Sequence, residues 1–322
     1  MPDHTPEETI EEITLSKEVV VAEQELTSSR RKVINKYMVA IFIILLVLLS
    51  TYLFLSAEQL TNLQLTLQQD HYRFYWMLLV GFGAEVVAGS MGMGYGVICT
   101  SLLLILNVPP PVVSASIHSA EAFTSAAGSF SHWQLGNVNK KLVKALAIPA
   151  IIGAVIGALL LTYVGEKYAK VTKPFIAAYT IYLGIKILQN AFKKKTINEQ
   201  KKKSNITVLG LIGGFIDSFG GGGWGPLVTG TFIKNGHTPR FVIGSSTVAK
   251  CILTVASAVT FIFTIGISHW NVVAGLLIGG IVTAPFSAML TAKLPTKKMF
   301  IAVGIVVIIC GLITICRAIF LK

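Results

Sequence analysis

The sequence predicts an all-α integral membrane protein with an N-terminal extra transmembrane helix and two inverted repeats. Each repeat is expected to contain a glycine-broken helical hairpin and three transmembrane helices. Composition is the first observation: 53% of the 322 residues are hydrophobic and only 13% are charged, whereas soluble domains carry roughly 25% charged residues. The mean hydropathy is +0.70. The second observation is that long apolar stretches recur along the chain, two of them interrupted by glycine runs.

Charges are concentrated in the N-terminal segment and in the connections between apolar stretches. Eight of the fifteen acidic residues lie in the first 29 positions, and the net charge of +12 comes mostly from Lys and Arg in loops. Such loops normally stay in the cytoplasm against anionic lipid. We interpret 1–36 as an acidic cytoplasmic tail and 37–57 as the extra transmembrane helix. A signal peptide would instead begin with a short basic leader.

The first repeat is expected over 76–192. Its opening apolar run, 76–108, would form a straight helix of ~50 Å, well beyond the ~30 Å hydrocarbon core. Glycines between 89 and 96 interrupt it, so we predict two short helices that meet at a glycine turn. Three prolines, Pro109 to Pro111, end this unit. The following spans are expected at 112–132, 144–164 and 172–192.

The second repeat is expected over 206–320, after a Lys-rich cytoplasmic linker at 193–205. Its first apolar stretch is broken by the glycine run that begins at Gly220, and further spans are expected at 240–266, 270–291 and 299–319. The two halves align without gaps at an offset of 129. The matched positions include Gly92, Gly94 and Gly96 with Gly221, Gly223 and Gly225, Tyr95 with Trp224, and Ser116 with Ser245.

The lysine distribution distinguishes two ways of threading each glycine-broken unit. If the unit crossed the membrane once, the Lys-rich linker would lie outside. If it is a hairpin, the linker and most other basic loops lie in the cytoplasm, and only the loop with Lys167, Lys170 and Lys173 lies outside. The hairpin follows the positive-inside rule better. It leaves three crossings per repeat, so the repeats are inverted, as in many secondary transporters. We therefore expect a plasma-membrane protein with a cytoplasmic N-terminus and an external C-terminus.

Four ionisable residues lie deep in apolar segments, where a charge costs roughly 3 kcal/mol on insertion scales. Glu121 and Lys250 occupy equivalent positions of the two repeats and are expected ~15 Å into the membrane. Glu85 and Asp217 lie at similar depth in the first arms of the hairpins. One interpretation is a structural Glu121–Lys250 ion pair. The other is an anion-binding lysine with a protonatable carboxylate beside it.

The residues around these charges complete the candidate substrate site. His118 and Glu121 are three residues apart, as are Thr247 and Lys250, so each pair shares a helical face. Glycine lets an anion approach backbone N–H groups at a hairpin tip, although glycines also permit close helix packing. The predicted substrate-binding residues are Lys250, Ser245, Ser246, Thr247, Ser116, His118, Gly92, Gly94, Gly96, Gly221, Gly222, Gly223 and Trp224.

Two segments of the second repeat, GFIDSFGGGGW at 214–224 and GSSTVAK at 244–250, resemble the TauE/SafE sulfite exporter family of membrane permeases. The resemblance spans about residues 76–320, and the first repeat departs from this pattern at 89–94 and 116–121. The resemblance implies transport of sulfur-containing anions such as sulfite or sulfonates, energised by the proton gradient. The expected partners are thus a small anionic substrate, the lipid bilayer and protons.

The leading functional hypothesis is a secondary transporter that exports such an anion. Glu121, helped by His118, is the candidate for carrying the proton, with Asp217 and Glu85 as rivals. A passive anion channel and an uptake permease for a related oxyanion are the alternatives. An intramembrane enzyme is disfavoured, because an aspartyl protease needs two aspartates and Asp217 is the only one inside an apolar span. The basic runs have no nucleic-acid signature. The four cysteines lie in apolar stretches without metal-ligand spacing, so no metal or other cofactor is expected.

Overall fold

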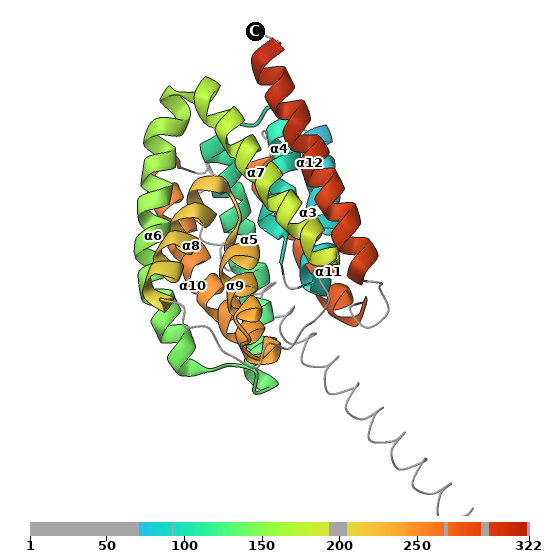
Figure 1. Ribbon diagram of the computed structural model, residues 1–322. Coiled ribbons are helices and arrows are strands. Elements are labelled where there is room, and N and C mark those ends of the chain that lie inside the picture. Colours follow the sequence, from blue (N-terminus) through green and yellow to red (C-terminus); the bar gives the residue numbers. More distant parts are fainter. Residues whose placement is uncertain (1–70, 92, 193–204, 267–269, 291–295, 321–322) are drawn as a thin grey trace, which may run out of the picture. The chain divides into compact units, whose positions relative to one another are not determined.

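The computed structural model describes residues 71–91, 93–192, 205–266, 270–290 and 296–320. All of them belong to one compact unit, 57–322, and within these ranges every regular element is a helix (Figure 1). The predictions for the tail at 1–36, the extra helix at 37–57 and the linker residues 193–204 fall outside the described residues.

The first half of the described chain opens with a broken helix, as expected. Helix α3 (His71–Met91) and the short helix α4 (Tyr95–Ile105) are separated at the predicted glycine turn. Three long helices follow: α5 (Pro110–Gln134), α6 (Lys140–Lys167) and α7 (Ala169–Phe192). Pro110 at the start of α5 suits the first helical turn, where its missing N–H leaves no bond unmade.

The second half has the same order of elements. Helix α8 (Ile206–Gly220) is followed by the predicted glycine break, and then by a π-helical turn η1 (Gly225–Thr229) and α9 (Gly230–Lys234). The three long helices are α10 (Pro239–Ile265), α11 (Trp270–Leu290) and α12 (Thr296–Phe320). The all-helical prediction is therefore confirmed within the described residues, and a helix break lies at each glycine run. The prediction of two short helices from residue 76 was wrong for the first of them, because α3 begins at His71 and has 21 residues.

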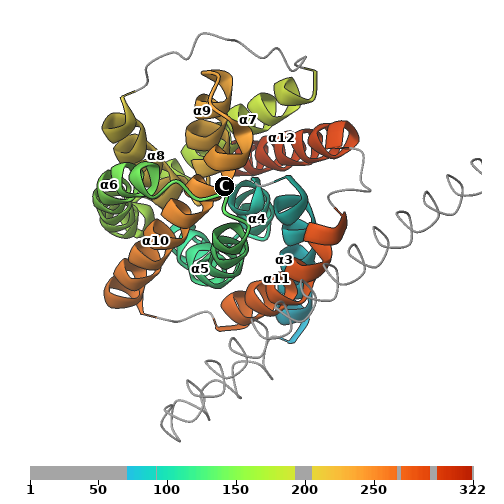
Figure 2. The ribbon, with the colours of Figure 1, turned by 90° about the horizontal axis from the view of Figure 1, so that it is seen from below.

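Helices from the two halves pack against each other in pairs. The most extensive contacts join α3 with α11, α6 with α8, α7 with α12, and α5 with α10. Seen end-on in Figure 2, α4, α5 and α10 lie between the α6–α8 pair and the α3–α11 pair. The α5–α10 contact therefore lies between these two pairs, and α10 also has exposed apolar side chains, Val255, Val259 and Phe263 among them.

Glycines allow the closest of these pairs to form. A Cβ atom on Gly81 of α3 would lie 2.5 Å from the carbonyl oxygen of Leu276 on α11. The residue equivalent to Gly81 at the offset of 129 is Gly210 of α8, whose Cβ would lie 2.9 Å from the carbonyl oxygen of Leu146 on α6. Small residues at helix interfaces let backbones approach in this way, which is typical of helix packing in membranes.

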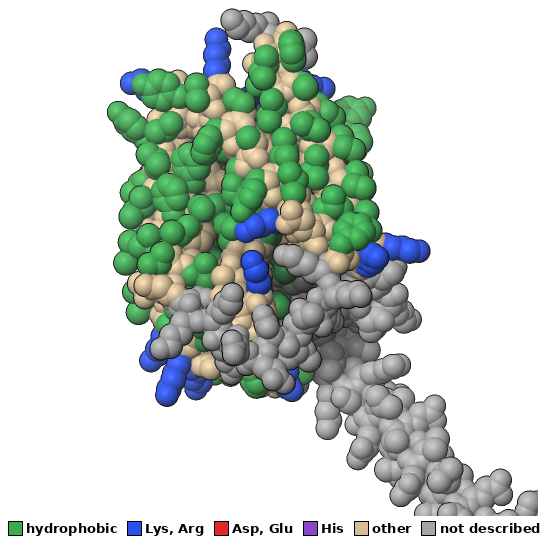
Figure 3. Space-filling view, viewed as in Figure 1, with side chains coloured by type: hydrophobic (Ala, Val, Ile, Leu, Met, Phe, Trp, Pro, Cys, Tyr) green, Lys and Arg blue, Asp and Glu red, His purple; other side chains and the backbone are tan. Residues whose placement is uncertain are grey.

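The outer surface is apolar around the sides of the bundle. Figure 3 shows hydrophobic side chains covering the visible face, with Lys and Arg mostly at its upper and lower margins and no Asp or Glu coloured there. On α6, for example, Ile148, Ile152 and Ile156 are exposed, whereas Ala150 and Ala154 are buried. Within the described ranges, four helices, α6, α7, α10 and α12, are long and apolar enough to cross a membrane. Polar groups inside and apolar groups outside are the arrangement that lipid requires.

Candidate functional site

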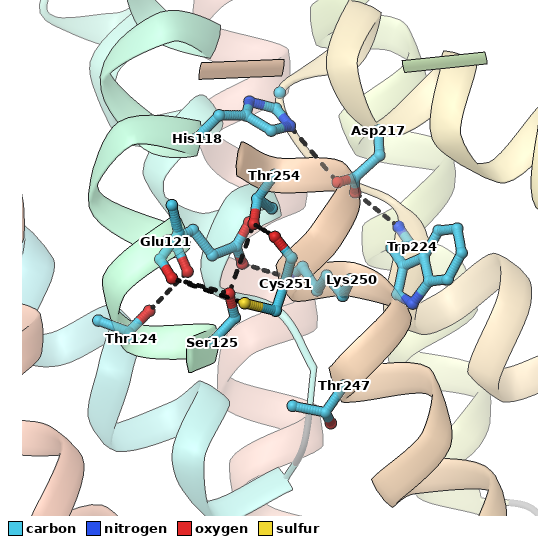
Figure 4. A network of polar contacts seen from close by, with 12 residues as sticks. His118, Glu121, Thr124, Ser125, Asp217, Trp224, Thr247, Lys250, Cys251 and Thr254 are labelled. Carbon is cyan, nitrogen blue, oxygen red and sulfur yellow. Dashed lines mark hydrogen bonds and ion pairs between the residues drawn. The ribbon is translucent and has the colours of Figure 1, made fainter. Parts of the chain in front are cut away.

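Glu121 of α5 and Lys250 of α10 form an ion pair inside the bundle (Figure 4). Lys250 Nζ donates a hydrogen bond to Glu121 Oε1. The Glu121 side chain is 4% exposed and the Lys250 side chain 18% exposed. Glu121 Oε2 is also buried and has no hydrogen-bond partner among the described residues. The sequence prediction that these two residues approach each other is therefore confirmed, and one carboxylate oxygen remains available to a further group.

The two helices meet through residues that the offset of 129 makes equivalent. Besides Glu121 and Lys250, the hydroxyls of Ser125 and Thr254 lie 3.4 Å apart. Cys251 Sγ lies 4.0 Å from the carbonyl oxygen of Ala122. Each of these contacts joins residue i to residue i+129. The α5–α10 contact is therefore made, at these three places, between positions that match in the sequence alignment of the two halves.

A second polar pair, His118 and Asp217, lies beside the first. His118 Nε2 of α5 is 3.4 Å from Asp217 Oδ2 of α8, and both side chains are completely buried. His118 Nδ1 contacts the carbonyl oxygen of Ser114 at 2.8 Å. Because Glu121 follows His118 by one helical turn, α5 presents both groups to the same interior region, as the spacing predicted.

Asp217 also connects the two arms of the second broken helix. It lies in the last turn of α8, and its Oδ1 accepts a hydrogen bond from the backbone N of Trp224 at 2.7 Å. The indole Nε1 of Trp224 donates to Ser246 Oγ of α10 at 2.8 Å, and the hydroxyls of Thr229 and Ser246 lie 2.6 Å apart. Two predicted site residues, Trp224 and Ser246, thus hold the glycine turn against α10.

Glu85 of α3 is buried within electrostatic range of Glu121 and Lys250. All four ionisable residues selected from the sequence therefore converge in one interior region, together with His118. A buried charge in a membrane is expensive unless it has a partner or faces a water-filled cavity. Three acids and two bases in one region can share protons and can rearrange their pairing when an ion enters.

The glycine turn of the second half requires glycine for two reasons. Gly221, Gly222 and Gly223 have φ values of +70°, +153° and +151°, which side chains rarely adopt. Their surroundings are also full: a Cβ on Gly222 would lie 2.6 Å from the carbonyl carbon of Gly96 in the first turn. The second glycine turn therefore packs directly on the start of α4, to which Gly96 belongs. Their proposed contact with an anion remains a prediction, because packing already accounts for these glycines.

The remaining predicted residues are less central. Gly94 has φ +109° and begins α4, and Gly92 lies outside the described residues. Ser245 Oγ accepts a hydrogen bond from the backbone N of Asn139 at 2.8 Å, beside the start of α6. Thr247 donates to the carbonyl oxygen of Ile243 and points away from the ion pair in Figure 4. Ser116 is buried in α5.

Several contributors to this region were not identified from the sequence. Thr100 Oγ1 of α4 donates to the carbonyl oxygen of Gly221 at 2.7 Å, and the Tyr179 hydroxyl of α7 donates to that of Gly222 at 3.2 Å. Ser218 and Ser257 share a hydrogen bond between α8 and α10. No motif marked Thr100 or Tyr179. Among the described residues, no group of three or more His, Cys, Asp or Glu side chains is arranged to hold a metal.

Comparison with known proteins gives consistent matches. Residues 77–314 match the family described as sulfite exporter TauE/SafE. The chain is 37% identical over 235 residues to "Probable membrane transporter protein YtnM" of Bacillus subtilis (strain 168), covering 70% of this chain and 77% of that protein. It is 25% identical over 245 residues to "Probable membrane transporter protein YdhB" of the same organism, covering 74% and 98%. No solved structure matches the chain.

Proposed function

Because the chain belongs to the TauE/SafE sulfite exporter family, we propose that this membrane transporter carries small sulfur-containing anions, such as sulfite or sulfonates, and couples their movement to protons. The proposed direction is export, and the proposed location is the plasma membrane. The observation that carries the proposal is the buried Glu121–Lys250 ion pair at the centre of the α5–α10 contact.

This ion pair suggests how an anion and a proton could be coupled. Without substrate, the ammonium group of Lys250 is paired with the carboxylate of Glu121. An arriving anion must compete with that carboxylate. A buried charge that has lost its partner is strongly destabilising, so the displaced Glu121 is expected to take up a proton. Anion and proton would then load together, which couples an inward proton gradient to uptake, or exchange if the geometry differs, which couples that gradient to export. Asp217 and Glu85, the other acids of the region, are rival proton carriers.

The repeat architecture is part of the proposal. The α4 and α9 segments end in the same way at an offset of 129: Asn107 has φ +61° and Gly236 has φ +82°. Asn107 N donates to the carbonyl oxygen of Leu104, and Gly236 N donates to that of Ile233, both at 3.1 Å. These matched helix ends support a duplication over 76–192 and 206–320.

The helix pairing supports an inverted arrangement of the repeats. The first helix of each half packs on the second long helix of the other half, as α3 packs on α11 and α8 on α6. We propose that both broken helices are hairpins, with the N-terminus and the 193–205 linker in the cytoplasm and the C-terminus outside. The closed ion pair favours a carrier over a passive anion channel, because a permanently open pore needs no internal salt bridge to break.

Flux into proteoliposomes tests the proposed function. Purified protein is reconstituted, and uptake of radiolabelled sulfite, sulfate and thiosulfate is measured with and without an imposed pH gradient. We expect accumulation of at least one sulfur oxyanion above its equilibrium level, and collapse of that accumulation when a protonophore is added. Downhill movement only, unaffected by the gradient, would support a channel. No flux of any of the three anions would contradict the proposed substrate class. The sign of the gradient that drives accumulation distinguishes co-transport with protons, which would give uptake in the cell, from exchange against protons, which would give export.

A further inference from the structure

The hydrogen positions around His118 are determined by its partners. Ser114 Oγ donates its hydrogen to the carbonyl oxygen of Ser218 at 2.5 Å, so it can only accept from His118 Nδ1, which lies 3.3 Å away. The other contact of Nδ1 is the carbonyl oxygen of Ser114 at 2.8 Å, which also can only accept. Nδ1 therefore carries a hydrogen, and Nε2 faces Asp217 Oδ2.

This arrangement requires one more proton. A neutral imidazole with hydrogen on Nδ1 has a lone pair on Nε2, and an ionised Asp217 has only lone pairs on Oδ2. Both atoms are buried and have no other hydrogen-bond partner among the described residues. Two acceptors that face each other away from water repel, and each lacks a donor. A single proton, on Nε2 or on Oδ2, converts this contact into a charge-assisted or neutral hydrogen bond.

The pair is mechanically connected to the turn of the second broken helix. Asp217 Oδ1 accepts a hydrogen bond from the backbone N of Trp224, and the indole Nε1 of Trp224 donates one to Ser246 Oγ. Ser246 precedes Lys250 by one helical turn on α10, so it lies on the same side of that helix. Figure 4 shows this path from His118 through Asp217 to Trp224, beside the Glu121–Lys250 pair. The turn is thus fixed to α5 through one side chain and to α10 through another.

We propose that the proton shared by His118 and Asp217 is a latch that holds the turn at 221–224 against α5 and α10, and that its loss releases this turn. When the proton is released, the carboxylate of Asp217 faces the lone pair of His118 Nε2, and the two acceptors repel. Movement of α8 and the turn away from His118 relieves this repulsion. The device is confined to the second half, because Ala88 occupies the position equivalent to Asp217. The latch rests on the proposed function in one respect: the proposed function identifies the ions that pass when the turn moves.

Other titratable groups act on this pair and must be separated from it. Glu121 of α5 interacts electrostatically with His118, and Lys250 of α10 with Asp217. Tyr179 of α7 interacts with Asp217 and also donates to the carbonyl oxygen of Gly222 in the turn. Glu85 of α3 acts on Glu121 and Lys250. Among the titratable groups of the described residues, only Asp217 contacts both His118 and the turn, which makes its substitution the selective test.

Trp224 is a natural reporter, because it is 1% exposed and lies in the turn. In the full chain, the other three tryptophans (Trp76, Trp133 and Trp270) are replaced by Phe, and acrylamide quenching is measured without substrate from acidic to alkaline pH. We expect low quenching at acidic pH and a several-fold rise, with a red shift, as the pH increases. Asp217→Asn, whose amide donates to Nε2 permanently, should keep quenching low throughout, whereas Asp217→Leu should keep it high.

Glu121→Gln in the same background identifies the titrating group. It should shift the pH profile at most, leaving its amplitude intact. A pH-independent signal in the unsubstituted reporter, or a pH response that persists in Asp217→Asn and disappears in Glu121→Gln, would overturn the latch. Because no substrate is present, failure of the anion-flux assay leaves this result unaffected, and the two proposals fail separately.

Nitrogen-15 NMR of histidine-labelled protein examines the proton directly. The His118 signals are assigned by their loss in His118→Gln. We expect Nδ1 to be protonated wherever Trp224 is protected from quenching, with Nε2 either protonated or hydrogen-bonded. An unprotonated Nδ1 in the protected state would contradict the hydrogen assignment on which the latch depends.

Discussion

Among the described residues, Lys250 is the only cation bonded to Glu121, and Lys250→Met removes it while leaving the carboxyl group of Glu121 inside the bundle. Glu121 is 4% exposed, and its second oxygen has no hydrogen-bond partner among the described residues. No other donor is therefore in place to substitute for Lys250. Breaking a buried pair by removing one partner costs about 3–5 kcal/mol. At roughly 2–4 °C per kcal/mol for chains of comparable size, the melting temperature should fall on the order of 10 °C.

The double variant Glu121→Met with Lys250→Met separates this cost from lost packing. Replacing both members of a buried pair by apolar side chains is often neutral or stabilising, so the double variant should recover most of the loss. Thermal unfolding of the purified protein in detergent provides the measurement. Lys144→Met, at an exposed lysine of α6, is the matched control and should unfold like the wild type. A double variant that is no more stable than Lys250→Met would refute the reasoning.

Three further predictions concern the architecture. Gly222→Ala should destabilise the protein by at least about 1–3 kcal/mol, because its φ is +153° and the added Cβ would collide with Gly96. Gly83→Ala is the control and should be nearly neutral in the same thermal assay, because no atom lies within 4 Å of the Cβ that it adds. The double variant Ser125→Cys and Thr254→Cys, made without the native cysteines, should form a disulfide. After proteolysis in the 193–205 linker, the two halves should then run together on a non-reducing gel, and separated halves would contradict the α5–α10 contact. A cysteine in that linker should react with impermeant reagent only in inside-out vesicles, and labelling in intact cells would contradict the hairpin topology.

The helices and their breaks were predictable because lipid imposes simple constraints on a sequence. Every spanning segment must satisfy its backbone internally, so long apolar runs indicate helices and glycine runs indicate where they break. The meeting of Glu121 and Lys250 was predictable for a different reason: they are equivalent positions in similar halves, and equivalent positions can face each other across a twofold axis.

The contacts around the glycine turn could not be predicted in this way. Asp217 reaches across the turn to Trp224, and that contact depends on how the two arms are placed in space. Thr100 and Tyr179 come from helices that no motif connects to the turn. The offset of 129 could have indicated the Ser125–Thr254 contact, because both residues carry hydroxyls. Sequence spacing also suggested that Thr247 lies beside Lys250 in the site, whereas its hydroxyl donates to the carbonyl oxygen of Ile243 in the same helix.

Proton-driven flux through Glu121→Gln tests the central claim most directly, because glutamine mimics the protonated acid. Wild type and variant are reconstituted side by side, and both anion exchange and the response to a pH gradient are measured with the anion that the wild type transports. Coupling through the Glu121–Lys250 pair predicts that the variant still exchanges the anion but no longer accumulates it when the gradient is applied. Accumulation equal to that of the wild type would contradict this account and would point to Asp217 as the proton carrier.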